Sequence, residues 1–174
     1  MEPVTVCVLD MDETLGRYDR NAFHVRPKLE TFINLLRLLK CDIILWSLGK
    51  DDYVRRVVSG HLPEIRDYAY KIFAYKECMN SEARYGFCKA SEHIRIMYDC
   101  DIFLIGVDDK VSENMDSRYD LRIQVKPYTS PDSKDVVLLE VCEKIINALA
   151  EARLDRLRPT TENENDYVEN TWVY

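Results

Sequence analysis

The segment VTVCVLDMDE, residues 4–13, constrains the fold most strongly, because a nearly unbroken apolar run ends in acidic residues. Apolar and β-branched residues without polar alternation are typical of a strand that is buried on both faces of a parallel sheet. Asp10 and Asp12 lie at the carboxyl end of this predicted strand, and open α/β sheets bind ligands outside the carboxyl ends of their strands. Two neighbouring carboxylates favour a bound cation or a retained proton. The sequence therefore predicts a ligand site at this point.

Length and charge limit the class of protein. The 174 residues, 47% of them hydrophobic, are enough for one domain with a sizeable core. The net charge of −7 argues against non-specific nucleic-acid binding and against binding to a membrane surface, although a local basic pocket remains open. No apolar stretch approaches the roughly 20 residues that cross a bilayer, and the N-terminus lacks a basic region ahead of an apolar one. We expect an intracellular protein, in the cytoplasm or nucleus, without a membrane partner.

The cysteines do not indicate a metal site. There is no CxxC pair, and the three histidines lie far from the six cysteines in the sequence, so a zinc site is not favoured. Four cysteines lie in or beside apolar runs, where a free thiol serves as a small hydrophobic residue in a reducing compartment. These four are Cys7, Cys41, Cys100 and Cys142.

Strands and helices alternate along the chain. After the first strand, further strands are predicted at residues 42–46, 71–75, 101–107 and 121–125. Helices are predicted at residues 27–40, 49–61, 89–98 and 130–157, the last capped by Asp132 or Ser133. Residues 16–25 and 80–86 are predicted as turns. This alternation indicates an α/β fold with a three-layer, doubly wound parallel sheet in residues 1–154 and no large cap domain, followed by a polar and aromatic tail at residues 155–174.

Polar residues follow the strands of this predicted sheet. Ser47 follows the second strand, Lys89 precedes a helix, and Asp108 and Asp109 follow another apolar strand. In a doubly wound sheet these positions converge with Asp10 on one crevice. Together they supply a nucleophile, a hydroxyl donor, a cation and carboxylates that bind a metal, which is the set of groups that phosphoryl transfer requires.

Each residue type has a chemical reason for its assigned role. Asp10 is placed to attack phosphorus and form an aspartyl-phosphate. Asp12, on the same side, can protonate the leaving alkoxide and later take a proton from water, which contributes roughly 10² to 10⁴ in rate. Mg²⁺ prefers oxygen ligands, which suits Asp10 together with Asp108 or Asp109. Ser47 and Lys89, the latter a cation, can bind the phosphoryl oxygens; Ser47 has the alternative role of a helix cap.

The motifs resemble those of a known family. DMDETL, residues 10–15, matches the DxDx[TV] signature of the haloacid-dehalogenase superfamily. Its Glu-Thr-Leu continuation is similar to the RNA polymerase II C-terminal-domain phosphatases and their small relatives. The segments LWSLGKDDYV, RYGFCKASEHI and FLIGVDDKVSEN resemble the second, third and fourth motifs of that group. The resemblance covers roughly residues 4–150, with the motifs in the right order.

The resemblance implies roles for individual residues. They are Asp10 as nucleophile, Asp12 as general acid and base that also offers its backbone carbonyl to Mg²⁺, Ser47 and Lys89 as phosphate-binding groups, Thr14 as a substrate-binding group, and Asp109, with Asp108 beside it, as metal ligand. One departure concerns the fourth motif. The polymerase-phosphatase group has Asp-Asn-Ser-Pro where this chain has DDKV, residues 108–111, which weakens the inference of a polymerase-tail substrate.

The spacing of the motifs bears on the substrate. Residues 14–27 are too few for a cap domain, and residues 60–89 allow only a small insertion. An uncapped crevice resembles those of superfamily members that act on phosphoproteins, because a macromolecular substrate itself then excludes water. We therefore expect a Mg²⁺-dependent protein serine/threonine phosphatase. A small-molecule phosphatase, a phosphoryl transferase, an enzyme of nucleic-acid ends and a catalytically silent binding module remain as alternatives, and the oligomeric state is undetermined.

Several other residues have structural interpretations. Arg26 is expected to pair with an acid, Trp46 to lie in the core, Asp51 and Asp52 to begin a helix, and His24, His61 and His93 to lie at the surface or pack.

Overall fold

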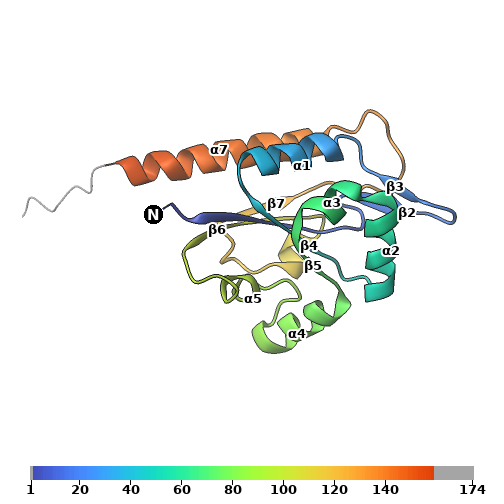
Figure 1. Ribbon diagram of the computed structural model, residues 1–174, viewed down its shortest axis with the longest axis horizontal. Helices are drawn as coiled ribbons and strands as arrows, with labels where there is room; N and C mark the ends of the chain where they lie inside the picture. The colour runs from blue at the N-terminus through green and yellow to red at the C-terminus, as the bar shows by residue number, and fades with distance from the viewer. Residues whose placement is uncertain (1, 159–174) are drawn as a thin grey trace, which may run out of the picture.

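A parallel sheet between two layers of helices forms the body of the protein (Figure 1). The computed structural model describes residues 2–158. The sheet has the strand order β5-β4-β1-β6-β7, and every neighbouring pair is parallel. The strands are β1 (Val4–Leu9), β4 (Asp42–Trp46), β5 (Ala69–Phe73), β6 (Ile102–Asp108) and β7 (Leu121–Gln124). The predicted three-layer, doubly wound α/β fold is confirmed.

The register of the sheet brings the ends of its central strands together. Leu9, the last residue of β1, pairs with Leu45 of β4 on one side and with Val107 of β6 on the other. The pairing continues one residue further, because the backbone N–H of Asp10 donates to the carbonyl of Val107 at 3.0 Å. The residues that follow these strands therefore emerge at one edge of the sheet.

Helices cover both faces of the sheet. One face packs against α1 (Leu29–Leu38), α2 (Asp51–His61), α3 (Pro63–Tyr68) and α7 (Val137–Leu157). The other packs against α4 (Tyr75–Tyr85), α5 (Ser91–Arg95) and α6 (Val111–Asn114). Side chains alternate between the two faces along each strand. In β1, Cys7 and Leu9 belong to the first core, whereas Val6 and Val8 belong to the second.

A hairpin replaces the turn predicted at residues 16–25. It consists of β2 (Gly16–Tyr18) and β3 (Phe23–Val25), which pair antiparallel. The Asp19 carboxylate closes the loop by accepting two backbone N–H groups. The Phe23 ring lies so close to Gly16 that it would clash with a Cβ at that position. Glycine at position 16 therefore permits the contact that anchors the hairpin.

Residues 80–86 are mostly helical, so the turn predicted there is wrong. They belong to α4, which begins where the Glu77 carboxylate accepts the backbone N–H of Ala74 at 3.0 Å. The helix ends at Gly86, whose φ of +81° suits a residue without a side chain. The Glu77 contact at the start, the glycine at the end and helix formers such as Glu82, Ala83 and Arg84 between them account for the helix.

The last helix begins later than predicted. It starts at Val137 rather than at residue 130, and neither Asp132 nor Ser133 caps it. Instead, the Asp135 carboxylate accepts the backbone N–H of Val137 at 3.0 Å. The division into a domain of residues 1–154 and a tail stays a prediction, since residues 159–174 lie outside the described part of the chain.

The expected packing residues lie where predicted, with one exception. Trp46 is fully buried, and the His93 ring lies tilted against it with the ring centroids 4.9 Å apart. His24 pairs with Asp19 at the surface, and His61 is exposed. All six cysteines are free thiols, and the exception is exposed Cys100, which lies in a loop between acidic residues rather than in the core. Within residues 2–158, no helix combines the length and apolarity that a bilayer crossing needs; the intracellular location stays a prediction.

Arg26 connects the chain after β1 to the chain after β7, which confirms its structural role. It is 1% exposed. Its guanidinium binds both Asp135 carboxylate oxygens at 3.0 Å and donates to the carbonyls of Thr14 at 3.1 Å and Lys126 at 2.8 Å. Burial raises the pKa of Asp135, but the hydrogen bonds from Arg26 and from the Val137 backbone, together with the charges of Arg26 and Lys126, lower the pKa below its ordinary value.

We predict that Arg26→Met lowers the free energy of unfolding by about 3 kcal/mol, because it leaves Asp135 without its cation and two carbonyls without their donor. Urea denaturation followed by circular dichroism measures the loss. Arg20→Met, at an exposed position of the hairpin loop, is the matched control and should change stability by less than about 0.5 kcal/mol. Similar losses in both variants would contradict the structural role of Arg26.

Candidate active site

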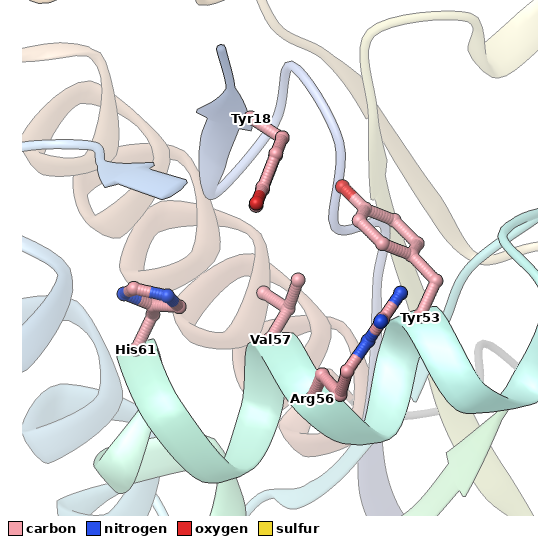
Figure 2. A pocket seen from close by; sticks show the side chains of 5 residues that line it. All are labelled: Tyr18, Tyr53, Arg56, Val57 and His61. Carbon is pink, nitrogen blue, oxygen red and sulfur yellow. The ribbon is translucent and has the colours of Figure 1, made fainter. Parts of the chain in front are cut away.

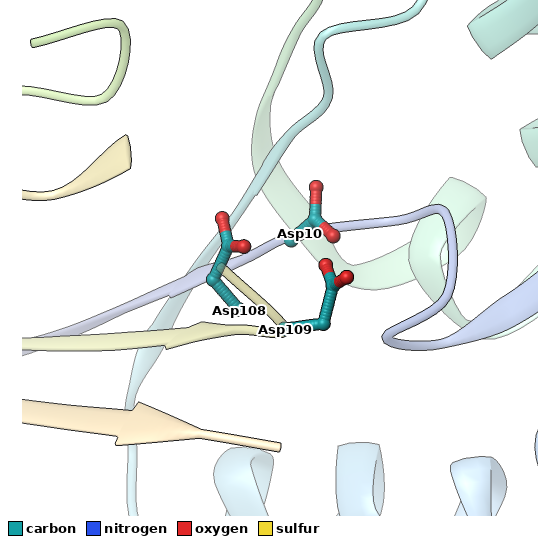
Figure 3. Close-up of side chains that lie close together, drawn as sticks. All are labelled: Asp10, Asp108 and Asp109. Atoms are coloured by element: carbon teal, nitrogen blue, oxygen red, sulfur yellow. The ribbon is translucent and has the colours of Figure 1, made fainter. Parts of the chain in front are cut away.

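Three carboxylates face one another at the carboxyl edge of the sheet (Figure 3). Asp10 follows β1, and Asp108 and Asp109 lie at the end of β6. Each residue offers a carboxylate oxygen within 4.8 Å of the others. The edge therefore brings together two predicted groups that are almost 100 residues apart in the sequence.

Lys89 bridges two of these carboxylates. Its Nζ lies 2.7 Å from Asp10 Oδ1 and 2.6 Å from Asp108 Oδ2, and the side chain is fully buried. Backbone contacts hold it in place, since its N–H donates to the Asn114 carbonyl and its own carbonyl accepts the Tyr119 hydroxyl, both at 2.9 Å. Burial by itself disfavours the ammonium, but the two carboxylates raise the pKa of Lys89 well above its ordinary value. Lys89 is therefore a permanent cation in the site.

Asp108 and Asp109 have different surroundings. Both Asp108 oxygens are held by protein donors, namely Lys89, the backbone N–H of Lys110 at 2.7 Å and the Asn114 amide at 3.0 and 3.1 Å. Asp109 is 8% exposed, whereas Asp108 is fully buried. Burial, and then the charge of Asp108, raise the pKa of Asp109. Asp108 is thus bound within the protein by four hydrogen bonds, and Asp109 is the more exposed of the two adjacent carboxylates.

The charge balance of the cluster fits a divalent cation. Three carboxylates against the single Lys89 ammonium leave an excess of two negative charges in a buried site. Burial raises the pKa of Asp10 to about 6 even though Lys89 opposes the shift. Carboxylates with raised pKa values gain from a metal that takes the place of a proton. The all-oxygen set of Asp10 and Asp109 suits Mg²⁺.

A tight turn after Asp10 positions Thr14. The turn depends on Glu13, whose φ is +63°, and the Glu13 N–H donates to the Gly16 carbonyl at 2.7 Å. It brings the buried Thr14 hydroxyl back to donate to Asp10 Oδ2 at 2.8 Å and to accept the Asp109 N–H at 3.2 Å. Thr14 therefore orients the carboxylate of Asp10 and the backbone of Asp109, and its substrate-binding role stays a prediction.

Asp12 has a partner that the sequence did not reveal. Asp12 is half-buried, and the Tyr53 hydroxyl donates to its Oδ1 at 2.5 Å. Burial raises the pKa of Asp12, and the hydrogen bond from Tyr53 opposes the rise. The sequence signal for Tyr53 is weak, since an aromatic residue in an amphipathic helix usually indicates a packing role. Asn114 gives no sequence signal of its own either, although it lies in the fourth motif.

Ser47 lies between β4 and α2. It is 1% exposed, and its hydroxyl accepts the Gly49 backbone N–H at 3.0 Å. It does not cap α2, because the N-cap of that helix is Lys50. The helix begins with Asp51 and Asp52, as predicted.

A family model covers most of the chain. The model described as NLI interacting factor-like phosphatase matches residues 5–158. No curated protein shows a significant match.

The fold is similar to several solved structures. An uncharacterised protein from Listeria monocytogenes has 12% sequence identity and a TM-score of 0.54, with 84% of this chain and 99% of that chain covered. The fission yeast RNA polymerase II CTD phosphatase Fcp1, bound to beryllium fluoride, has 13% identity and a TM-score of 0.49, with coverage of 88% and 52%. The 3-deoxy-D-manno-octulosonate 8-phosphate phosphatase from Moraxella catarrhalis has 12% identity and a TM-score of 0.43, with coverage of 89% and 94%. The chain thus spans about half the length of the yeast protein. At these identities the comparisons support the fold alone, and the Listeria protein, which has the highest TM-score of the three, carries that support.

We predict that Lys89→Met lowers the free energy of unfolding by about 3 kcal/mol, because Asp10 and Asp108 would remain buried without their cation. Urea denaturation in the absence of divalent cations measures this loss. Lys110→Met is the control, since the Lys110 side chain is exposed and only its backbone binds Asp108. If Lys89→Met were as stable as the control, the buried ion pairs would not stabilise the fold.

Proposed function

Because the chain belongs to the NLI interacting factor-like phosphatase family, within the haloacid-dehalogenase superfamily, we propose that it is a Mg²⁺-dependent phosphatase that hydrolyses phosphate monoesters through an aspartyl-phosphate. The observation that carries this proposal is the cluster of Asp10, Asp108 and Asp109 arranged around Lys89 at the ligand-binding edge of the sheet.

The reaction proceeds in two displacements. A carboxylate oxygen of Asp10 attacks phosphorus, and the bond from phosphorus to the substrate oxygen breaks as the leaving alkoxide takes a proton from Asp12. Water then attacks the phosphorus of the aspartyl-phosphate while Asp12 accepts a proton from it. Inorganic phosphate leaves and the Asp10 carboxylate is restored. Burial raises the pKa of Asp12, which is the direction that helps a general acid to hold its proton.

Other residues balance charge and bind the phosphoryl group. Asp10 and Asp109 would hold Mg²⁺ together with the backbone carbonyl of Asp12, and the ion reduces the repulsion between a carboxylate nucleophile and a phosphate. Ser47 and Lys89 would bind phosphoryl oxygens, with Lys89 already charged and placed beside Asp10. Thr14 contributes by holding Asp10 in position.

We infer that the substrate is a protein that carries phosphoserine or phosphothreonine. Between β1 and α1 the chain forms only the short β2–β3 hairpin, and between β4 and β6 the described insertion consists of α2–α5 and β5. These elements pack against the sheet and its helices rather than forming a separate cap. The edge is therefore accessible to a macromolecule. A small-molecule phosphatase and a silent binding module are the alternatives that the assay below separates.

We predict that the purified chain releases phosphate from p-nitrophenyl phosphate and from phosphopeptides only when Mg²⁺ is present. Asp10→Asn should lower kcat/KM by roughly 10³-fold or more, because the nucleophile is lost. Asp99→Asn, at an exposed position, is the matched control and should retain full activity. Equal turnover by the wild type and Asp10→Asn would end the proposed mechanism, and sugar phosphates turned over faster than phosphopeptides would reject the protein substrate.

We also predict that Mg²⁺ stabilises the folded chain, because the ion binds the native carboxylate cluster and not the unfolded chain. At one hundred times its Kd, the ion should add about 2.7 kcal/mol. Thermal unfolding with and without Mg²⁺ measures this effect independently of activity. Asp109→Asn should remove the stabilisation, whereas Glu113→Gln, an exposed residue of α6, should keep it. Full stabilisation of Asp109→Asn by Mg²⁺ would show that the ion binds elsewhere.

A further inference from the structure

A cavity adjoins the active site. Its volume is about 420 Å³, and Tyr18, Tyr53, Arg56, Val57 and His61 line it (Figure 2). Tyr18 comes from the β2–β3 hairpin and the other four residues come from α2. Tyr53 is shared with the active site, because its hydroxyl donates to Asp12. The cavity therefore lies next to the proposed general acid.

The lining combines an apolar interior with a basic side. Val57 is 2% exposed, and the Tyr18 and Tyr53 rings meet edge to face with their centroids 6.1 Å apart. Figure 2 shows the Tyr18 hydroxyl directed toward Val57 and the Arg56 guanidinium beside Tyr53. Such a cavity suits a side chain with an aliphatic body and an anionic end.

Arg56 is available to bind an anion. It is exposed, and it takes part in none of the ion pairs formed within residues 2–158. Its position is notable in a chain of net charge −7, because the overall charge does not attract an acidic ligand. A cation in the lining of the cavity provides local attraction for an acidic group in spite of this overall charge.

We propose that this cavity is a specificity subsite that binds an acidic side chain of the substrate, glutamate in particular, with its methylene groups on Val57 and its carboxylate on Arg56. The inference rests on the proposed function, since the acidic residue would belong to the phosphoprotein whose phosphorylated residue lies at Asp10. It extends that function by naming a sequence preference.

The dimensions of α2 indicate where the acidic residue lies in the substrate. A helix rises 1.5 Å per residue, so Arg56 lies about 4.5 Å and His61 about 12 Å beyond Tyr53 along the axis. An extended peptide advances about 3.3 Å per residue. Counted from Tyr53, these distances correspond to roughly one to four residues of an extended peptide, and the peptides below place the acidic residue within that range.

The test compares paired phosphopeptides that carry either glutamate or glutamine two and three positions on each side of phosphoserine. The wild type should prefer the glutamate peptide by roughly three- to tenfold in kcat/KM, the range of a partly buried charge-assisted hydrogen bond. Arg56→Gln should reduce this preference to near one. Arg55→Gln removes the same charge from the neighbouring residue, which does not line the cavity, and should retain the preference. Each rate is divided by that variant's rate on p-nitrophenyl phosphate.

Two results would overturn the subsite. One is a wild-type ratio of glutamate to glutamine kcat/KM near one. The other is an equal loss of that preference in Arg56→Gln and Arg55→Gln, which would indicate a general electrostatic attraction and not a specific contact. Failure of the proposed function is separate, because it would appear as the absence of turnover on every substrate. In that case the peptides are compared by fluorescence anisotropy with Asp10→Asn as the binding partner. Tighter binding of the glutamate peptide that is lost with Arg56→Gln and kept with Arg55→Gln supports the subsite, and equal binding of the two peptides rejects it.

Discussion

The active-site edge depends on the two buried ion pairs that the Lys89 ammonium forms with Asp10 and Asp108. The ammonium joins Asp10 after β1 to Asp108 at the end of β6, so that two acids can lie side by side in a site with little solvent. Without this cation, the carboxylates would repel one another or take up protons. The single positive charge of Lys89 does not neutralise the three carboxylates, so the remaining negative charge of Asp10 and Asp109 suits a divalent ion. The same residue thus pairs two buried acids within the fold and leaves the net negative charge to which the proposed metal would bind.

The sheet and the convergence of the site were predictable because they depend on local patterns. Apolar runs define β1 and β6, and parallel strands bring the residues after them to one edge. The hairpin at residues 16–25 was not predictable in this way, because it depends on the Phe23 ring against Gly16. The helix across residues 80–86 depends on its capping by Glu77 and Gly86 rather than on apolar periodicity.

The division of roles within the site could be read only from the structure. Asp108 and Asp109 are adjacent and chemically alike in the sequence, and only the folded chain places Asn114 and Lys89 on Asp108. Tyr53 is 41 residues from Asp12, and no local pattern indicates that they meet. Contacts between distant side chains depend on how the helices pack on the sheet, and local sequence patterns do not reveal that packing.

Tyr53 belongs both to the wall of the cavity and to the hydrogen bond with Asp12. If a substrate side chain bound in the proposed subsite displaced the Tyr53 hydroxyl, Asp12 would lose a donor that stabilises its carboxylate and would hold its proton more firmly. Thermodynamic reciprocity requires the converse, namely that the ionisation state of Asp12 alters the affinity of the cavity. Under the proposed function, peptide binding and proton transfer would therefore be coupled through the Tyr53 hydroxyl.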